Sequence, residues 1–350
     1  MIPDNILFTN NIKSAFADFF STKSFSKIGV IVDENTKVYC LPKITDENIL
    51  KKLIIIEIKS GEENKNIDSC ILIWKKLTNY KFDRNSLLIN LGGGVITDMG
   101  GFIASTYKRG IKFINIPTTL LSQVDASIGG KTGIDFFEFK NHIGLFNNPS
   151  QIIISTEFLK TLNNREIKSG FAEIIKHSLI YESGYFNKIL KYKWDEQVWK
   201  YHIKKSINIK SEIVTKDPKD LGIRKILNFG HTIGHGIEST FINSRNKLLH
   251  GESILIGILC ESYISTIKTG LSKINLKKIS NYILANYNFK KIKKSNFKKI
   301  INNLIQDKKN KNGFIKMSLL KNIGISTYNI TISKNEIIES LLYFNNLLKK

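Results

Sequence analysis

Cysteine and arginine are both scarce in this 350-residue chain, and the shortage of cysteine excludes one class of protein. The three cysteines, Cys40, Cys70 and Cys260, are odd in number and lie far apart, which fits neither a disulfide framework nor a thiolate metal site. We therefore expect a chain of the reducing cytoplasm. Its first residues also lack a basic stretch followed by an apolar core, so no signal peptide is expected.

Long apolar runs are absent as well. The longest candidate, Ile254 to Leu259, is far shorter than the roughly 18 to 20 residues that a membrane-spanning helix needs, so no membrane partner is expected. The hydrophobic content of 42% and the length indicate a globular protein with two domains of ordinary size.

The scarcity of arginine changes how the net charge of +23 is interpreted. Such a charge suggests nucleic-acid binding, because basic clusters contact the phosphate backbone. Only five of the 53 basic residues are arginine, however, and the lysines are scattered among many Asn and Ile residues. This pattern indicates a general drift toward lysine rather than selection for bidentate phosphate contacts, which favour arginine. No nucleic-acid partner is therefore expected.

The order of apolar segments predicts the fold class. Short β-rich runs alternate with helical stretches in the first half of the chain, which predicts an α/β protein with a parallel, doubly wound sheet. These runs are Lys27–Asp33, Leu53–Lys59, Ser86–Leu91, Phe113–Ile116 and Ile152–Ile154. From Asn163 onward the pattern is mostly helical, with a strand-like run near Phe314 to Leu320. We expect the domain boundary near residue 160, giving domains 1–160 and 161–350.

The third β-rich run leads directly into a glycine-rich turn, Gly92 to Asp98. Three glycines between a strand and a helix let the backbone approach a pyrophosphate, and the helix N-terminus supplies amide donors. The turn lacks the GxGxxG spacing. Two explanations stay open, a nucleotide site and a tight turn that needs glycine.

A second glycine-rich segment surrounds Lys131. Its sequence, GGKT, tempts a P-loop interpretation, but Asp125 occupies the place of the first glycine that this motif requires. Lys131 is better explained as a glycine-flanked cation presented to an anion. Lys140 to Gly144 is expected to form another structured turn.

Three of the six histidines gather between Asn228 and Glu252. His231 and His235 are four residues apart, which places both imidazoles on one face of a predicted helix. His250 follows after a loop, at the start of another helix. Such a cluster suits a divalent metal such as zinc, but a helical histidine pair is also a common polar patch.

One acidic residue, Glu173, lies on the same face of a predicted helix as Lys176, among apolar neighbours. A carboxylate in such a place either pairs with the lysine or binds a metal. The residues alone leave both alternatives open.

Six segments follow one another in a characteristic order and spacing: LGGGVITDMGGF, YKRGIKFINIPTTLLSQVDASIGGKTGID, KNHIG, SGFAEIIKH, LNFGHTIGHGIES and LHGES. Together they closely resemble the 3-dehydroquinate synthase family, and the resemblance runs from about Gly61 to Lys309. It implies a homodimer with an N-terminal Rossmann-like, NAD-binding domain and a mainly α-helical C-terminal domain that binds metal and substrate.

The resemblance also implies the activity, that of a carbon–oxygen lyase of the shikimate pathway. The sugar phosphate 3-deoxy-D-arabino-heptulosonate 7-phosphate would become 3-dehydroquinate and phosphate. The steps would be transient oxidation by NAD, phosphate elimination, re-reduction, ring opening and intramolecular aldol closure.

The resemblance further implies a set of cofactor residues. Zinc, with cobalt as an alternative, would be bound by Glu173, His231 and His250, and three protein ligands leave positions open for substrate. The positions that match NAD-holding residues are Asp33, Asn35, Glu62, Lys65, Gly94, Val95, Ile96, Thr97, Asp98, Thr118, Thr119, Lys131, Lys140, Phe158, Leu159, Lys160 and Thr161.

The implied substrate set is largely cationic, because the substrate carries a carboxylate and a phosphate. It comprises Asp125, Arg109, Lys131, Asn141, Lys176, Lys210, Arg224, Asn228, His235 and one of Lys308 or Lys309. We expect His235 to assist proton movement, since imidazole titrates near neutral pH, although the substrate's own phosphate is an alternative base. Whether Arg109 serves its own site or a neighbour's stays open.

Two positions depart from the family pattern. Phe139 stands where glycine is usual, and Thr97 replaces a small residue in the glycine turn. The rival functions are another sugar phosphate cyclase and a metal-dependent enzyme of the glycerol dehydrogenase type. Asn228 and His235 favour dehydroquinate formation over the other cyclases, and a glycerol dehydrogenase would not need the cations from Lys131 to Arg224.

Overall fold

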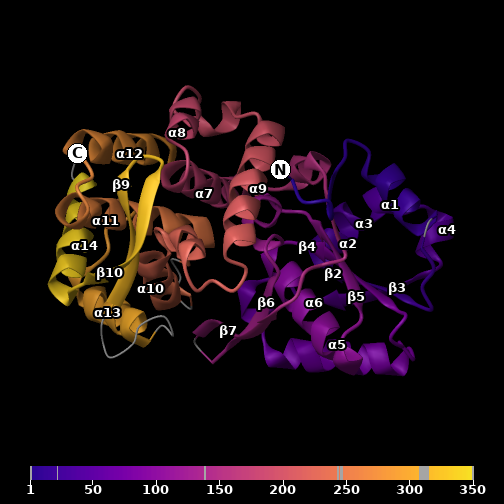
Figure 1. Cartoon of the computed structure of the whole chain (residues 1–350). Helices are drawn as coiled ribbons and strands as arrows, with labels where there is room; N and C mark the ends of the chain where they lie inside the picture. The colour runs from indigo at the N-terminus through magenta and orange to yellow at the C-terminus, as the bar shows by residue number, and fades with distance from the viewer. Residues whose placement is uncertain are drawn as a thin grey trace. The chain divides into compact units, whose positions relative to one another are not determined.

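The computed structural model describes residues 2–21, 23–137, 139–242, 244, 247–306 and 315–348. The chain forms two compact units, Met1–Ile167 and Lys168–Lys350, and each is described by itself (Figure 1). The first is built on a parallel sheet and the second is mainly helical, which confirms the predicted fold class. The sequence places the division near residue 160.

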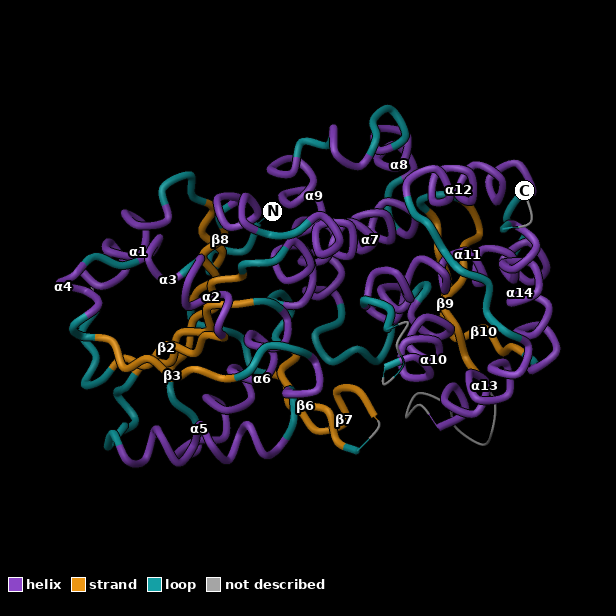
Figure 2. Tube along the Cα trace, turned by 180° about the vertical axis from the view of Figure 1, so that it is seen from behind, coloured by secondary structure: helices purple, strands orange, loops and turns teal. Residues whose placement is uncertain are grey.

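A six-stranded sheet forms the centre of the first unit, with the strand order β1-β8-β5-β4-β2-β3 (Figures 1 and 2). The paired strands run parallel to one another. The strands are β1 (Ile6–Phe8), β2 (Ile28–Asp33), β3 (Leu53–Ile58), β4 (Leu87–Gly92), β5 (Lys112–Pro117) and β8 (Gln151–Ile154). The pattern predicts all of these except β1, which is too short to show a period.

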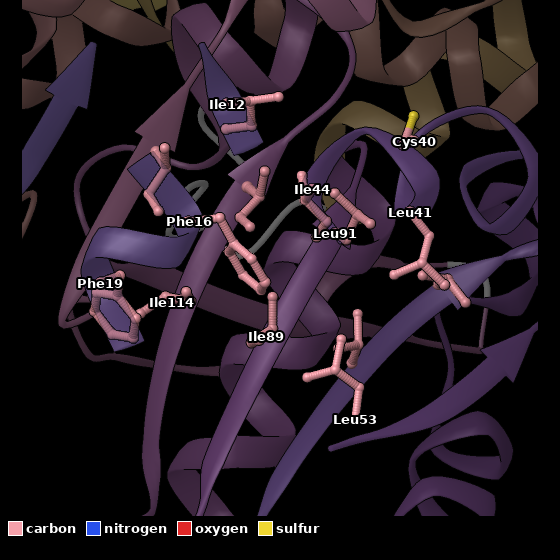
Figure 3. Close-up of a cluster of buried hydrophobic side chains, with 14 of the residues drawn as sticks. Ile12, Phe16, Phe19, Cys40, Leu41, Ile44, Leu53, Ile89, Leu91 and Ile114 are labelled. Carbon is pink, nitrogen blue, oxygen red and sulfur yellow. The ribbon is translucent and has the colours of Figure 1, made fainter. Parts of the chain in front are cut away.

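Both faces of the sheet are buried at its central strands β2, β4, β5 and β8, which are apolar at nearly every position. Val30 and Val32 of β2 pack on one face with side chains of α1 (Ile12–Ser21) and α3 (Leu41–Ile44), and Figure 3 shows part of this cluster. Ile31 points to the other face, where α5 (Ile67–Asn79) and α6 (Gly94–Thr106) pack. Short elements complete the unit: α2 (Glu34–Tyr39), α4 (Glu47–Leu50), η1 (Glu62–Asn64), η2 (Tyr107–Arg109), η3 (Ser122–Ala126) and η4 (Thr156–Thr161).

The connections change direction across the sheet between β2 and β4. β3 follows β2 on one side, whereas β4, β5 and β8 follow in turn on the other side. Ligands of doubly wound proteins bind at such a switch point, beyond the carboxyl ends of the strands. Asp33 ends β2 and the glycine turn follows β4, so both lie at this edge.

The segment 140–144 belongs to a strand, and its prediction as a turn is wrong. β6 (Lys131–Phe136) and β7 (Phe139–Phe146) form an antiparallel hairpin in which Gly133 faces Gly144. A Cβ atom on Gly133 would lie 2.6 Å from a backbone carbonyl oxygen of β7. These glycines, which resemble turn residues in the sequence, therefore allow two strands to approach closely.

Phe139, one of the two departures from the family pattern, begins β7. It pairs with Phe136 across a register shift near the end of the hairpin. Asn141 has a φ of 51°, a left-handed conformation that asparagine tolerates better than most residues. The strand therefore contains an irregularity next to a predicted site residue.

Helices build most of the second unit. They are α7 (Asn164–Ile180), which begins at the end of the first unit, α8 (Ser183–Ile189), η5 (Trp194–Glu196), α9 (Trp199–Lys216), η6 (Ile223–Asn228), α10 (His231–Phe241), α11 (His250–Lys268), α12 (Lys273–Asn286), η7 (Lys294–Asn296), α13 (Phe297–Gln306) and α14 (Lys334–Leu347). No helix in the described part of the chain has the length and hydropathy to cross a membrane.

A β-hairpin also belongs to the second unit, between α13 and α14 (Figure 1). β9 (Ile315–Asn322) matches the strand-like run expected near residue 320, and β10 (Ile325–Ile332) pairs with it antiparallel. β10 is not predicted, because polar residues interrupt its apolar positions and only its last residue is buried. Gly324 makes the turn with a φ of 81°.

Acid sensitivity is expected from a buried pair on α8 and α9. The Tyr185 hydroxyl hydrogen-bonds His202 Nδ1 at 3.0 Å, and burial lowers the pKa of His202 from 6.5 to about 4. As the pH falls from 6.5 toward 4, His202 becomes protonated in the unfolded chain but stays neutral in the folded chain. Folding should therefore lose up to about 3 kcal/mol over this range.

Urea unfolding at pH 7.5 and pH 4.5 tests this prediction. His202→Gln, which keeps an acceptor for Tyr185, should lose less stability between the two pH values than the parent. His142→Gln, at an exposed position of β7, is the matched control and should behave like the parent. Equal losses in the parent and in His202→Gln would contradict the assignment.

Candidate functional site

The carboxylate of Glu173 is the centre of the histidine cluster. Glu173 lies on α7 and is fully buried, with its Oε2 atom paired to the Lys176 ammonium one helical turn later. Its Oε1 atom lies 3.4 Å from His231 Nε2 on α10 and 3.4 Å from His250 Nε2 on α11. The two alternatives left open by the sequence are thus both present, since one oxygen pairs with lysine and the other faces two imidazoles.

In both imidazoles, the hydrogen bond made by Nδ1 determines whether Nε2 carries a proton or a lone pair. His231 Nδ1 lies 3.2 Å from the carbonyl oxygen of Phe229, and His250 Nδ1 lies 3.2 Å from the Glu238 carboxylate. Both partners accept hydrogen bonds, so each Nδ1 carries the proton and donates it. In the neutral rings, each Nε2 atom therefore presents a lone pair toward Glu173.

This donor set fits a divalent metal ion. Three electron-pair donors, one carboxylate oxygen and two imidazole nitrogens, converge without a proton between them in the neutral rings. The edge of a tetrahedron whose centre lies about 2.1 Å from each corner is about 3.4 Å, and these are the bond lengths of zinc to nitrogen and oxygen. The two 3.4 Å separations match this edge.

Charges around the cluster also favour a cation near His250. Burial alone would raise the pKa of Glu173, but Lys176 and His231 outweigh it and hold this pKa well below the ordinary value. Burial would lower the pKa of His250, but the carboxylates of Glu238 and Glu173 raise it to about 10. The cluster therefore attracts positive charge, which a proton or a metal ion can supply.

His235 lies on the same face of α10 as His231, as the spacing predicts. Its ring centroid is 5.2 Å from that of His231 and 5.8 Å from that of His250. The three histidines also have ligand atoms within 4.8 Å of one another, so they form an alternative donor set. In the set with Glu173, the carboxylate oxygen lies 3.4 Å from each of the two imidazole nitrogens.

Glycines bring the helices that carry these ligands close together. A Cβ on Gly257 of α11 would lie 1.9 Å from the carbonyl oxygen of Gly230, just before α10. A Cβ on Gly251, next to His250, would lie 2.0 Å from the carbonyl oxygen of Ser169 on α7. Only glycine fits at these two contacts, so they fix the separation of the three helices.

We expect Gly257→Ala to destabilise the protein by about 1–3 kcal/mol, because the added methyl group must push α10 away from α11. The same displacement would move His231 relative to His250 and weaken metal binding. Gly184→Ala is the control, since a Cβ there meets nothing within 4 Å. Thermal unfolding and chelator competition measure both effects, and a variant as stable as the Gly184 control would contradict the close contact.

A second carboxylate, which sequence analysis misses, fixes the start of α10. Glu261 is buried in the middle of α11 and accepts hydrogen bonds from Gly230 N at 2.6 Å and Ile233 N at 3.0 Å. Gly230 has no side chain to cap the helix, so Glu261 does so from another element. The sequence of α11 contains two glutamates, Glu252 and Glu261, and nothing in it marks Glu261 as the capping residue.

Three members of the predicted substrate set belong to α9 and η6 of the second unit. Lys210 and Arg224 are buried on α9 and η6, which pack together, and Asn228 is half-buried three residues before α10 begins. The carboxylate of Asp217, also missed in the sequence, accepts bonds from the backbone of Leu221, Gly222 and Arg224. It therefore shapes the turn that presents Arg224.

The first unit carries the predicted NAD set at the carboxyl edge of its sheet. Gly94, Val95 and Asp98 are half-buried in the first turns of α6, whereas Ile96 and Thr97 are buried. Gly93, the N-cap residue, provides no side-chain cap, so the first amides can donate to an anion. Asp33 caps α2 by accepting from Thr36 N at 2.7 Å, and Asn35 follows in that helix.

A buried ion-pair network joins several of these loops. Lys65 Nζ lies 2.6 Å from Asp98 Oδ2 and 2.6 Å from Asn141 Oδ1, and Lys140 Nζ lies 3.1 Å from Glu62 Oε1. It ties the loop after β3 and the first turns of α6 to the β6–β7 hairpin. Lys65 is almost fully buried, so its ammonium organises the site from within the protein.

The remaining predicted NAD-binding residues differ in how far their side chains are buried. Thr118 is buried, and the hydroxyl of Thr119 lies 2.9 Å from that of Ser122. Phe158 and Leu159 are buried in η4, so their side chains belong to the core. Among the four predicted residues from Phe158 to Thr161, Lys160 and Thr161 are exposed.

The structure does not bring every predicted residue of the first unit to this edge. Arg109 is exposed just beyond the far end of α6, whose 13 residues span about 20 Å from the glycine turn. Asp125 does lie beside this edge, because η3 packs against α6 and its Ala126 would be 3.4 Å from a Cβ on Gly94 of the glycine turn. Lys131 is exposed at the start of β6. Lys308 and Lys309 lie outside the described residues.

Comparisons with known proteins cover nearly the whole chain. Family models described as 3-dehydroquinate synthase N-terminal and C-terminal match residues 55–169 and 170–310. A 3-dehydroquinate synthase of Parabacteroides distasonis is 40% identical over 347 residues, which cover 98% of each chain. One of Ruminiclostridium cellulolyticum is 38% identical over 331 residues, which cover 92% of this chain and 90% of the relative.

Two solved structures share the fold at low sequence identity. A 2-epi-5-epi-valiolone synthase from Streptomyces hygroscopicus, solved with NAD+ and Zn2+ bound, has a TM-score of 0.84 and 22% identity, covering 99% of this chain and 98% of the other. A 2-deoxy-scyllo-inosose synthase, solved with carbaglucose-6-phosphate, NAD+ and Co2+, has a TM-score of 0.82 and 22% identity, covering 96% and 95%.

Proposed function

Because this chain belongs to the 3-dehydroquinate synthase family, we propose that it converts 3-deoxy-D-arabino-heptulosonate 7-phosphate into 3-dehydroquinate and phosphate. The observation that carries this proposal is the convergence of Glu173, His231 and His250 in a chain that aligns with such enzymes over nearly its full length. The reaction would serve the shikimate pathway in the cytoplasm, where the buried free cysteines are stable.

The divalent ion of this reaction would be bound by Glu173, His231 and His250, with zinc first and cobalt as the alternative. Bound there, it would supply Lewis acidity to a substrate hydroxyl. Lys176 holds the carboxylate of Glu173 by its other oxygen, so this ligand cannot rotate away. The carbonyl of Phe229 and the carboxylate of Glu238 hold the two imidazoles in the protonation state that a metal needs.

NAD would bind at the carboxyl edge of the parallel sheet and supply reversible hydride transfer. The amides at the start of α6 would face its pyrophosphate, with Asp33 and the loop after β3 beside them. At Ile96, Thr97, Phe158 and Leu159, contact would come from the backbone, because these side chains are buried.

The substrate would be bound through its two anionic groups. Lys210 and Arg224 are buried cations in the second unit, and cations of this kind form charge-assisted hydrogen bonds with phosphate and carboxylate. The full proposed set also contains Arg109, Asp125, Lys131, Asn141, Lys176, Asn228, His235 and one of Lys308 or Lys309. His235 would move a proton, with the substrate's phosphate as the alternative base.

We further propose a homodimer in which Arg109 serves the partner's site, since it lies at the opposite end of α6 from the glycine turn. Arg109→Gln and Lys210→Gln should each inactivate the enzyme. Subunits of the two variants, mixed by denaturation and refolding, should recover about a quarter of the parental activity, because half the dimers are mixed and each has one intact site. No recovery, alongside full recovery in a parental control, would place Arg109 in its own site.

Turnover tests the proposed function. Purified protein loaded with zinc and NAD+ should release phosphate and 3-dehydroquinate in equal amounts from the heptulosonate phosphate, without net NADH. Steady NADH formation from glycerol would instead indicate the dehydrogenase alternative. Product only from other heptulose or hexose phosphates would indicate another sugar phosphate cyclase.

A further inference from the structure

We propose that Glu238 is a positioning residue for the metal site, which fixes the ring of His250 and places a second carboxylate next to the direct ligands. The proposal rests on the metal site of the proposed function. Glu238 lies on α10, seven residues after His231 and therefore two helical turns away on the same face. Helix α10 thus provides the ligand His231 and also the carboxylate that contacts the ligand His250.

The contact between Glu238 and His250 determines the direction of the imidazole ring. Glu238 Oε2 lies 3.2 Å from His250 Nδ1, and the glutamate side chain is only 8% exposed. His250 is the first residue of α11, and the Glu238 carboxylate holds the Nδ1 side of its ring. With the Nδ1 proton donated to Glu238, the Nε2 lone pair points toward Glu173 Oε1 at 3.4 Å.

The two histidine ligands differ in this outer partner. His231 donates to the backbone carbonyl of Phe229, a neutral acceptor. His250 donates to a carboxylate, which makes its ring more electron-rich and a stronger ligand. The support of His250 is therefore the one that a side-chain substitution can remove.

The charge count explains why a carboxylate is needed at this position. Glu173 carries one negative charge, but its Oε2 atom is paired with the buried ammonium of Lys176. The pair is neutral overall, and both histidine ligands are neutral when they bind a metal. Glu238 therefore adds a carboxylate in direct contact with the ligand His250, and a negative charge at this place favours a cation at the site.

Metal affinity tests the proposal independently of catalysis. Zn2+ affinity would be measured by chelator competition, and the visible spectrum of Co2+ would report the geometry of the site. Glu238→Leu, which removes both the acceptor and the charge, should weaken Zn2+ binding roughly 100-fold, and Glu238→Gln, which keeps an acceptor, should weaken it roughly 10-fold. Glu182→Gln, an exposed carboxylate paired with Lys205, is the control and should bind like the parent.

The outcomes separate this proposal from the proposed function. A parent protein that binds Zn2+ and forms 3-dehydroquinate, together with a Glu238→Leu variant of equal Zn2+ affinity and Co2+ spectrum, would overturn the role of Glu238 alone. A parent that binds no divalent ion would overturn both. Thermal unfolding in the presence of chelator shows whether each variant folds. If Glu238→Leu does not fold, the Zn2+ affinity of Glu238→Gln, which differs least in shape from the parent, decides whether Glu238 supports the site.

Discussion

Replacing Glu173 with glutamine is expected to remove tight metal binding and to reduce turnover roughly a thousand-fold, about 4 kcal/mol in activation free energy. The amide oxygen is a neutral and weaker ligand than the carboxylate oxygen that faces His231 and His250 at 3.4 Å. Metal content after dialysis and the rate of 3-dehydroquinate formation measure the two effects. A variant with full metal content and full turnover would exclude Glu173 from the site.

The same substitution leaves Lys176 with a neutral partner inside the protein. An unpaired buried ammonium is costly, so part of the loss could come from unfolding. The double variant Glu173→Gln with Lys176→Met removes that charge and tests the metal site in a stable background. Glu212→Gln, an exposed carboxylate paired with Lys216, should keep both metal and turnover.

The second large effect is expected at His235. His235→Ala should retain the metal but lower turnover by roughly 100-fold to 10,000-fold, the usual contribution of a group that transfers a proton. Metal analysis and the pH dependence of kcat would be measured together. Full turnover with normal zinc content would exclude the role, and loss of zinc would favour the alternative donor set of three histidines.

The sequence predicts the first unit well because its strands are continuous apolar runs between turns. The run at 86–91 is short and apolar and lies directly before a glycine turn, a pattern that predicts a buried strand. The structure has β4 at Leu87–Gly92. The pattern fails for β7 because its glycines serve cross-strand packing rather than a turn. It fails for β10 because an exposed strand of a two-stranded sheet needs no continuous apolar face.

The candidate site was predictable in part. The helical spacing of His231 and His235 follows from sequence alone, but Glu173 could be assigned to the same cluster only through the family resemblance. Glu238 and Glu261 carry no signal that distinguishes them from ordinary glutamates in helices. Their importance depends on packing between α10 and α11, which places them against His250 and the first amides of α10.

The three converging ligands come from three separate helices, α7, α10 and α11. An ion bound by them would act as a reversible cross-link that closes two chain loops only in the folded state. Stability would then depend on supply: at a free ion concentration one hundred times the dissociation constant, binding adds about 2.7 kcal/mol to folding. Chains synthesised under metal starvation would unfold more often and so be more open to proteolysis than those that acquire the ion.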